Sequence, residues 1–129
     1  MRKSILFLLL ILTVFLNVKL NAQELKNTGA FYKTTTNILI AINTFDEVNN
    51  GGLEKETAIL KIDKNLNAIN SLFETLKEKY AKDEDFKEYE GWVSGIEKSL
   101  EFMKKDEPTY AFMCSLIKLN IYDFVNGKY

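Results

Sequence analysis

The chain of 129 residues contains no histidine, one cysteine and one proline, and its single arginine is Arg2. Without histidine it lacks the imidazole base of Ser-His-Asp and Cys-His catalysis, and imidazole ligands for zinc or haem. Without arginine beyond position 2 it has no bidentate clamp for phosphate or carboxylate groups. One cysteine cannot form a disulfide within the chain. We therefore expect no cofactor, no metal site, no catalytic residues and no enzymatic activity.

The first 22 residues have the pattern of a secretory signal peptide. Arg2 and Lys3 precede an apolar run from Ile5 to Leu16, and Ala22 offers a small residue at a cleavage point. The run is much shorter than the ~20 apolar residues that span a bilayer. We predict that residues 1–22 are removed on export to the periplasm or the extracellular medium. Residues 23–129 would then form one domain with no stable membrane insertion.

Removal of this segment changes the charge of the chain. The whole sequence has a formal net charge of −1, with 17 basic and 18 acidic residues. Loss of Arg2, Lys3 and Lys19 would leave 14 lysines against the same 18 acidic residues, a net charge of −4. An acidic surface without arginine argues against nucleic acid as a partner, because phosphates attract clustered cations.

Two central segments have the spacing of amphipathic helices, with apolar residues at alternating intervals of three and four. The first seam consists of Ile59, Ile62, Leu66, Ile69, Phe73, Leu76 and Tyr80. The second consists of Phe86, Tyr89, Val93, Ile96, Leu100 and Met103. We expect Glu54 and Glu56 in the first turn of the first helix, where they complement its dipole. Asp85 and Glu88 are expected to form a capping box at the start of the second.

Two further helices complete the expected fold. Residues 109–126 are strongly apolar after Pro108, and Gly127 suits a C-terminal cap. Residues 31–45 also fit a strand, but no second strand is present to pair with it, so a helix capped by Asn27 or Thr28 is favoured. A turn is expected at residues 49–52 and a short link at residues 81–84. The sequence therefore predicts an all-α, antiparallel up-down four-helix bundle.

The last helix carries two apolar arcs rather than one stripe. The broad arc contains Tyr110, Met113, Cys114, Ile117, Ile121, Phe124 and Val125. The second arc contains Phe112, Leu116 and Leu119 and is interrupted by Asp123. Two arcs indicate contact with more than one neighbour. The neighbour that contacts the second arc is either another helix of the bundle, a protein partner or a second copy of the chain.

Gly91 and Gly95 lie four residues apart inside a predicted helix, where each glycine costs ~1 kcal/mol relative to alanine. Close approach of a neighbouring helix through these small residues is one explanation. The other is a hollow beside Trp92 in which a ligand or a partner side chain binds, because ligand sites are often built between bundle helices.

Other polar and sulfur-containing groups have simpler explanations. Asp63, Asn65, Asn67 and Glu74 match part of a calcium-loop spacing, but Ala68 replaces the required glycine and the helical seam continues through them. Acidic residues between positions 83 and 90 suit a helix start. Met103, Met113 and Cys114 lie on arcs that face the core, where they act as apolar fillers.

The sequence thus favours a small, exported, non-catalytic helical-bundle module that binds a protein partner or a small apolar ligand. The candidate binding residues are Gly91, Trp92, Gly95, Phe112, Leu116 and Leu119. A homodimer through the last helix is one form of this hypothesis. An alternative is an acidic inhibitor or immunity-type protein that masks a basic toxin or enzyme, and a third is an enzyme based on carboxylates or lysine.

Overall fold

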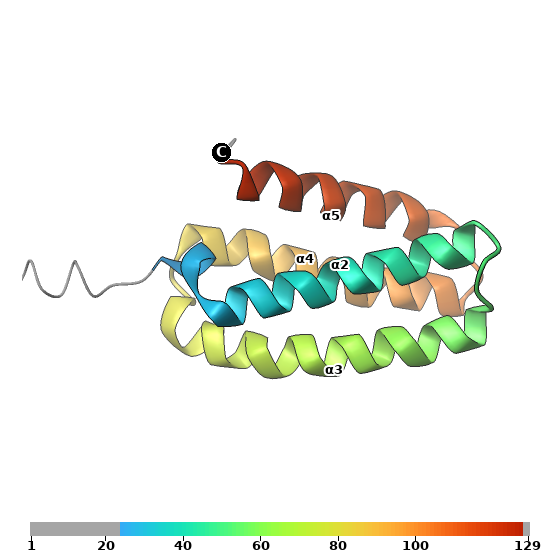
Figure 1. The fold of residues 1–129 in the computed structure, drawn as a ribbon, viewed down its shortest axis with the longest axis horizontal. Helices are drawn as coiled ribbons and strands as arrows, with labels where there is room; N and C mark the ends of the chain where they lie inside the picture. Colours follow the sequence, from blue (N-terminus) through green and yellow to red (C-terminus); the bar gives the residue numbers. More distant parts are fainter. Residues whose placement is uncertain (1–23, 128–129) are drawn as a thin grey trace, which may run out of the picture.

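The computed structural model describes residues 24–127, and this part of the chain is helical throughout its regular structure (Figure 1). A short 3-10 helix, η1 (Leu25–Asn27), precedes α2 (Gly29–Asn49), α3 (Lys55–Tyr80), α4 (Glu84–Lys104) and α5 (Thr109–Val125). No strand occurs between residues 24 and 127, so the prediction of an all-α fold with four helices is confirmed for this part. The predicted signal peptide at residues 1–22 lies outside the described residues. Within the described part, none of the helices combines the length and apolar character needed to cross a membrane.

Ring contacts show how the helices are placed against one another. Phe31, near the start of α2, lies 5.8 Å from Phe124, near the end of α5, between ring centroids. Phe45, near the end of α2, lies 5.8 Å from Tyr110, near the start of α5. In Figure 1, α3 and α5 lie on opposite sides of α2, and α5 packs on both α2 and α4. The last helix, α5, therefore covers one side of the other three helices.

Both predicted apolar seams form the core. Every member of the α4 seam is buried, and the α3 seam is buried from Ile62 to Tyr80. Ile59, the first member of the α3 seam, is only half-buried, and Ala58 occupies the buried position in that turn. These side chains join those of α2 and α5 in one continuous cluster. The alternating spacing of three and four is thus explained by one face of each helix turned inward.

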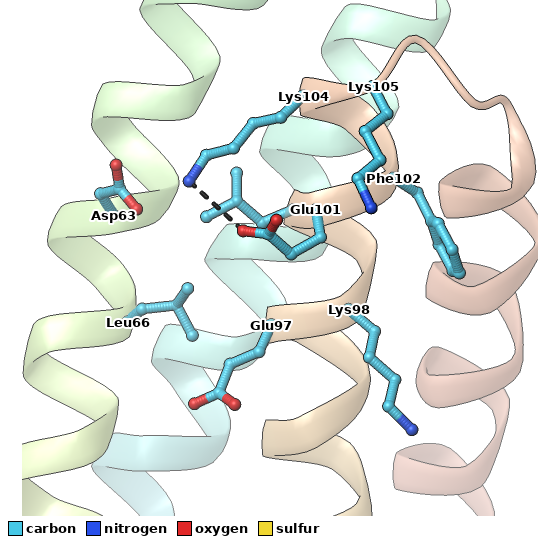
Figure 2. A pocket seen from close by; sticks show the side chains of 9 residues that line it. Asp63, Leu66, Glu97, Lys98, Glu101, Phe102, Lys104 and Lys105 are labelled. Carbon is cyan, nitrogen blue, oxygen red and sulfur yellow. Dashed lines mark ion pairs between the residues drawn. The ribbon is translucent and has the colours of Figure 1, made fainter.

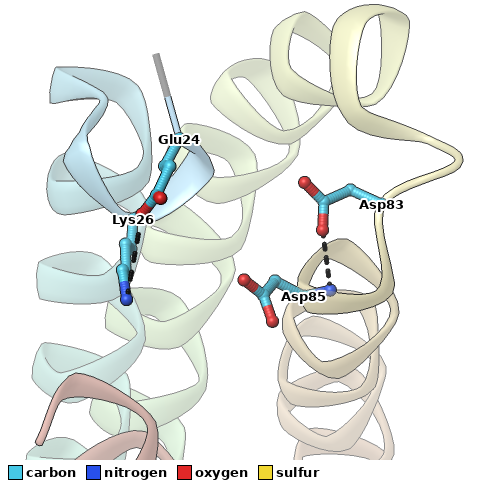
Figure 3. A network of polar contacts seen from close by, with 4 residues as sticks. All are labelled: Glu24, Lys26, Asp83 and Asp85. Atoms are coloured by element: carbon cyan, nitrogen blue, oxygen red, sulfur yellow. Dashed lines mark hydrogen bonds and ion pairs between the residues drawn. The ribbon is translucent and has the colours of Figure 1, made fainter. Parts of the chain in front are cut away.

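The helix starts confirm one predicted cap and correct two others. Thr28 caps α2, because its hydroxyl accepts a hydrogen bond from the Phe31 amide at 3.1 Å. The predicted capping box of Asp85 and Glu88 is wrong. Asp83 caps α4 instead, and its carboxylate accepts the Asp85 amide at 2.9 Å (Figure 3). Asp83 has the extended backbone of an N-cap residue, with φ −76° and ψ 135°. The helix therefore begins directly after Asp83, and Asp85 lies inside its first turn. Glu54 likewise precedes α3 as its N-cap, and only Glu56 lies in the first turn.

The connection between α4 and α5 is tied to the start of α3. Asp106 has a left-handed backbone with φ 58°, which aspartate tolerates better than most residues. The following amide, that of Glu107, donates to the Phe102 carbonyl at 2.8 Å and closes the end of α4. The Lys55 ammonium donates to the Asp106 carboxylate, and this bond raises the pKa of Lys55. Past α5, Gly127 has φ 68°, in agreement with its predicted part in ending that helix.

Candidate functional site

Trp92 lies inside the bundle and not beside a cleft. Only 2% of it is exposed, and its ring packs edge-on against Phe124 with 5.2 Å between centroids. It belongs to an aromatic cluster at the end of the bundle where α2 begins and α5 ends. The cluster consists of Phe31, Phe73, Phe86, Tyr89, Trp92 and Phe124. The volume beside Trp92 is therefore filled by other rings.

The two glycines of α4 have different surroundings. A Cβ atom built on Gly95 would lie 2.6 Å from Ile117 Cδ1 and 3.2 Å from Ile117 Cγ1, so α4 and α5 approach closely at this residue. Gly91 is exposed, and a Cβ atom there would meet nothing within 4 Å. Of the two explanations left open by the sequence, the structure shows the packed helix contact at Gly95. The hollow is absent from this surface of the described chain, and neither explanation accounts for Gly91.

Two polar atoms of the aromatic cluster are buried without a hydrogen-bond partner, the Tyr89 hydroxyl and the Trp92 indole N–H. Burial raises the pKa of Tyr89 to about 12. The nearby Thr34 hydroxyl opposes this rise, although it forms no hydrogen bond with the phenol. Thr34 instead donates to the Ala30 carbonyl at 2.8 Å. Since Tyr89 is fully buried and Trp92 nearly so, these two groups form part of the core and not of an open ligand pocket.

The second apolar arc of the last helix faces solvent. Phe112 is 66% exposed, Leu116 45% and Leu119 55%, and Tyr122 extends the row with 60%. We call these four residues the α5 outer face. Tyr122 was not predicted to belong to this row, although its spacing of three from Leu119 continues it. Val125 was predicted on the core arc, but 64% of it is exposed because it ends the helix beyond the buried Phe124.

A groove of about 350 Å³ runs beside the α5 outer face, between α5 and α2. Ile42, which is buried, contributes from α2 together with the half-buried Asp46. Leu119 and Tyr122 line it from α5, with Ser115 and Lys118. The groove and the exposed row thus form one surface with an apolar floor and a single charged group from each helix. Along its whole length α5 carries only two charged residues, Lys118 and Asp123.

A second groove, of about 520 Å³, lies along α4 on the side of α3 (Figure 2). Asp63 and Leu66 contribute to it from α3, and Glu97 and Glu101 from α4. Glu101 pairs with Lys104 at 3.6 Å, and both glutamates are exposed to solvent. Carboxylates in such a setting do not form the enclosed acid–base pair that hydrolysis requires. Among residues 24–127, no group of three or more His, Cys, Asp or Glu side chains is placed to hold a metal ion.

Cys114 lies in the core on the face of α5 opposite the outer face and is completely buried. Burial raises the pKa of its thiol to about 12, although the nearby Ser99 hydroxyl opposes part of this rise. A thiol that stays protonated and shielded is neither a nucleophile nor a metal ligand. The prediction that Cys114 acts as an apolar filler agrees with this placement.

We expect the Cys114 thiol to be unreactive toward an aromatic disulfide reagent in the folded protein and fully reactive in urea. The raised pKa of the thiol also makes stability fall at alkaline pH. Above pH 9 the unfolded thiol loses its proton, while the folded thiol keeps it until about pH 12, so the free energy of unfolding decreases over that range. Urea titrations between these pH values measure the slope, and Cys114→Ala should reduce it. Rapid labelling of the native protein would contradict the burial of this thiol.

No family model matches the chain, and no curated protein or solved structure matches it either. The function is therefore inferred from the α5 outer face and its surroundings.

Proposed function

We propose that this chain is a small, exported, non-catalytic interaction module whose protein partner contacts the α5 outer face. Its scaffold is an antiparallel up-down bundle in which α2, α3 and α4 support α5. Export follows from the signal-peptide pattern of residues 1–22, and the module acts outside the cytoplasm.

The observation that supports this proposal most strongly is the concentration of large exposed apolar side chains on one helix. Five of the eight such residues between positions 24 and 127 belong to α5, and four of them form the α5 outer face. The remaining three, Tyr32, Ile40 and Leu60, are divided between α2 and α3. Single exposed apolar residues are ordinary, whereas a contiguous row beside a groove is typical of an interaction site.

A protein suits this surface better than a small apolar ligand. Small-ligand sites enclose most of the ligand surface, usually within a preformed pocket. Here Trp92 and its neighbouring rings fill the bundle end, and the groove beside α5 is open along its length. A partner helix or strand can cover a row of side chains that projects from the surface, which a small molecule cannot do.

A photo-cross-linking amino acid tests where the partner binds. Placed at Phe112 of the protein in its producing cells, it should give a covalent adduct with a discrete protein. Placed at Leu60, which is 72% exposed on α3, it should give little or none, since Leu60 lies apart from the α5 outer face. Equal yields at the two positions, or no adduct at Phe112, would contradict the proposed function.

A further inference from the structure

The α5 outer face has a projecting side chain, and the groove beside this face could receive such a side chain from another molecule. Phe112 is the most exposed of the four residues, and it lies one turn before Leu116. The lining of the groove on α5 runs from Ser115 to Tyr122, so its centre lies about two to three residues after Leu116. At a rise of 1.5 Å per residue, Phe112 and the centre of the groove lie at similar distances on either side of Leu116, roughly 4–7 Å along the helix axis.

From this arrangement we infer that the partner is a second copy of this chain, paired through the α5 outer faces about a two-fold axis near Leu116. A two-fold axis turns the second α5 to run in the opposite direction. It therefore places Phe112 of each copy over the Leu119 and Tyr122 groove of the other. Leu116 meets its own counterpart at the axis. The inference rests on the proposed function, since it names the occupant of the same surface.

The charges of α5 are compatible with this self-pairing. In the register centred on Leu116, Lys118 lies opposite position 114 of the other copy, and Asp123 lies opposite position 109. Neither charge faces its own counterpart, and the helix as a whole has one positive and one negative side chain. By contrast, α4 has six acidic and three basic residues, so two copies would repel one another across its exposed side. Among the four long helices, α5 is the one that two acidic molecules can bring together at the smallest electrostatic cost.

The area of the face indicates a reversible dimer. From the exposed fractions of its four residues, the face presents on the order of 400 Å² of apolar surface. Two copies contribute roughly twice that area, and their polar rims, which include Ser115 and Lys118, bring the total near the ~1,000 Å² lower limit of specific interfaces. A dimer of this kind forms at micromolar or higher concentrations and dissociates on dilution.

Charged substitutions of Leu116, the residue at the two-fold axis, test this inference. Protein purified from expression of the full chain is examined by sedimentation velocity over about 1 µM to 1 mM, the range expected for a small interface. The unmodified protein should shift from monomer to dimer. Leu116→Glu and Leu116→Lys should each raise the dissociation constant at least about tenfold, because like charges meet at the axis. An equimolar mixture of the two should recover the dimer, since each Glu then faces a Lys.

Leu60→Glu is the matched control, because it adds the same charge at an exposed leucine on α3, away from the α5 outer face. It should leave the dissociation constant unchanged. An unmodified protein that stays monomeric throughout the range overturns the inference, as does a mixture of the Glu and Lys variants that stays monomeric. If the monomeric protein still forms an adduct with a different protein at Phe112, the self-pairing fails and the proposed function stands. If it forms none, both fail.

Discussion

Phe31→Ala is expected to lower the free energy of unfolding by about 3–5 kcal/mol, the cost of removing a large aromatic side chain from a packed core. Only 3% of Phe31 is exposed. Its ring lies 5.3 Å from that of Tyr89 and 5.8 Å from that of Phe124, so it joins α2 to both α4 and α5. The substitution would leave a cavity at the point where these helices meet. Urea unfolding followed by Trp92 fluorescence and circular dichroism measures the loss, since Trp92 is the only tryptophan and lies in the same cluster.

The neighbouring Tyr32 supplies a control for this measurement. It is an aromatic residue on the same turn of α2, but 73% of it is exposed. Tyr32→Ala should therefore change stability by no more than about 0.5 kcal/mol. Similar losses for the two variants would show that the ring of Phe31 is not where the structure places it.

Gly95→Leu is expected to destabilise the protein by about 2–3 kcal/mol through overpacking. The first side-chain atom would already approach Ile117 Cδ1 to 2.6 Å, and the larger leucine must push α4 and α5 apart. Leucine is a better helix former than glycine, so the local preference of the chain works against this loss and cannot cause it. The same urea titration gives the free energy of unfolding.

Two companion variants separate the steric effect from other causes. Gly91→Leu should be neutral or stabilising by up to about 1 kcal/mol, because an added side chain there meets open space. Combining Gly95→Leu with Ile117→Ala should cost less than the sum of the two single variants, since the smaller side chain makes room for the leucine. Additive losses would contradict a direct contact between these two positions.

The helices could be predicted because their apolar spacing is long and regular. From Ile62 to Tyr80 and from Phe86 to Met103, every predicted seam residue is buried. The precise starts could not be predicted in the same way. Both Asp83 and Asp85 suit an N-cap, and the choice depends on which residue adopts an extended backbone. The position of Val125 was missed because angular position on a helix does not tell how far the neighbouring helices extend.

The candidate binding site could likewise be predicted only in part. The second arc of Phe112, Leu116 and Leu119 could be found from sequence, since helical geometry alone places these residues together. What that arc faces depends on how the four helices are arranged, which periodicity does not determine. For the same reason the sequence left Gly95 between two explanations, and only the position of Ile117 on the neighbouring helix distinguished them.

Amide chemical shifts would map the contact surface of this protein directly. Spectra of the isotope-labelled protein are compared at low and high concentration, and again after addition of unlabelled envelope extract from its producing cells. We expect shifts confined to residues 112–122 and to the facing part of α2 around Ile42 and Asp46. Shifts centred on the groove between α3 and α4, or no shifts under either condition, would contradict the claim that this protein acts by contact through α5.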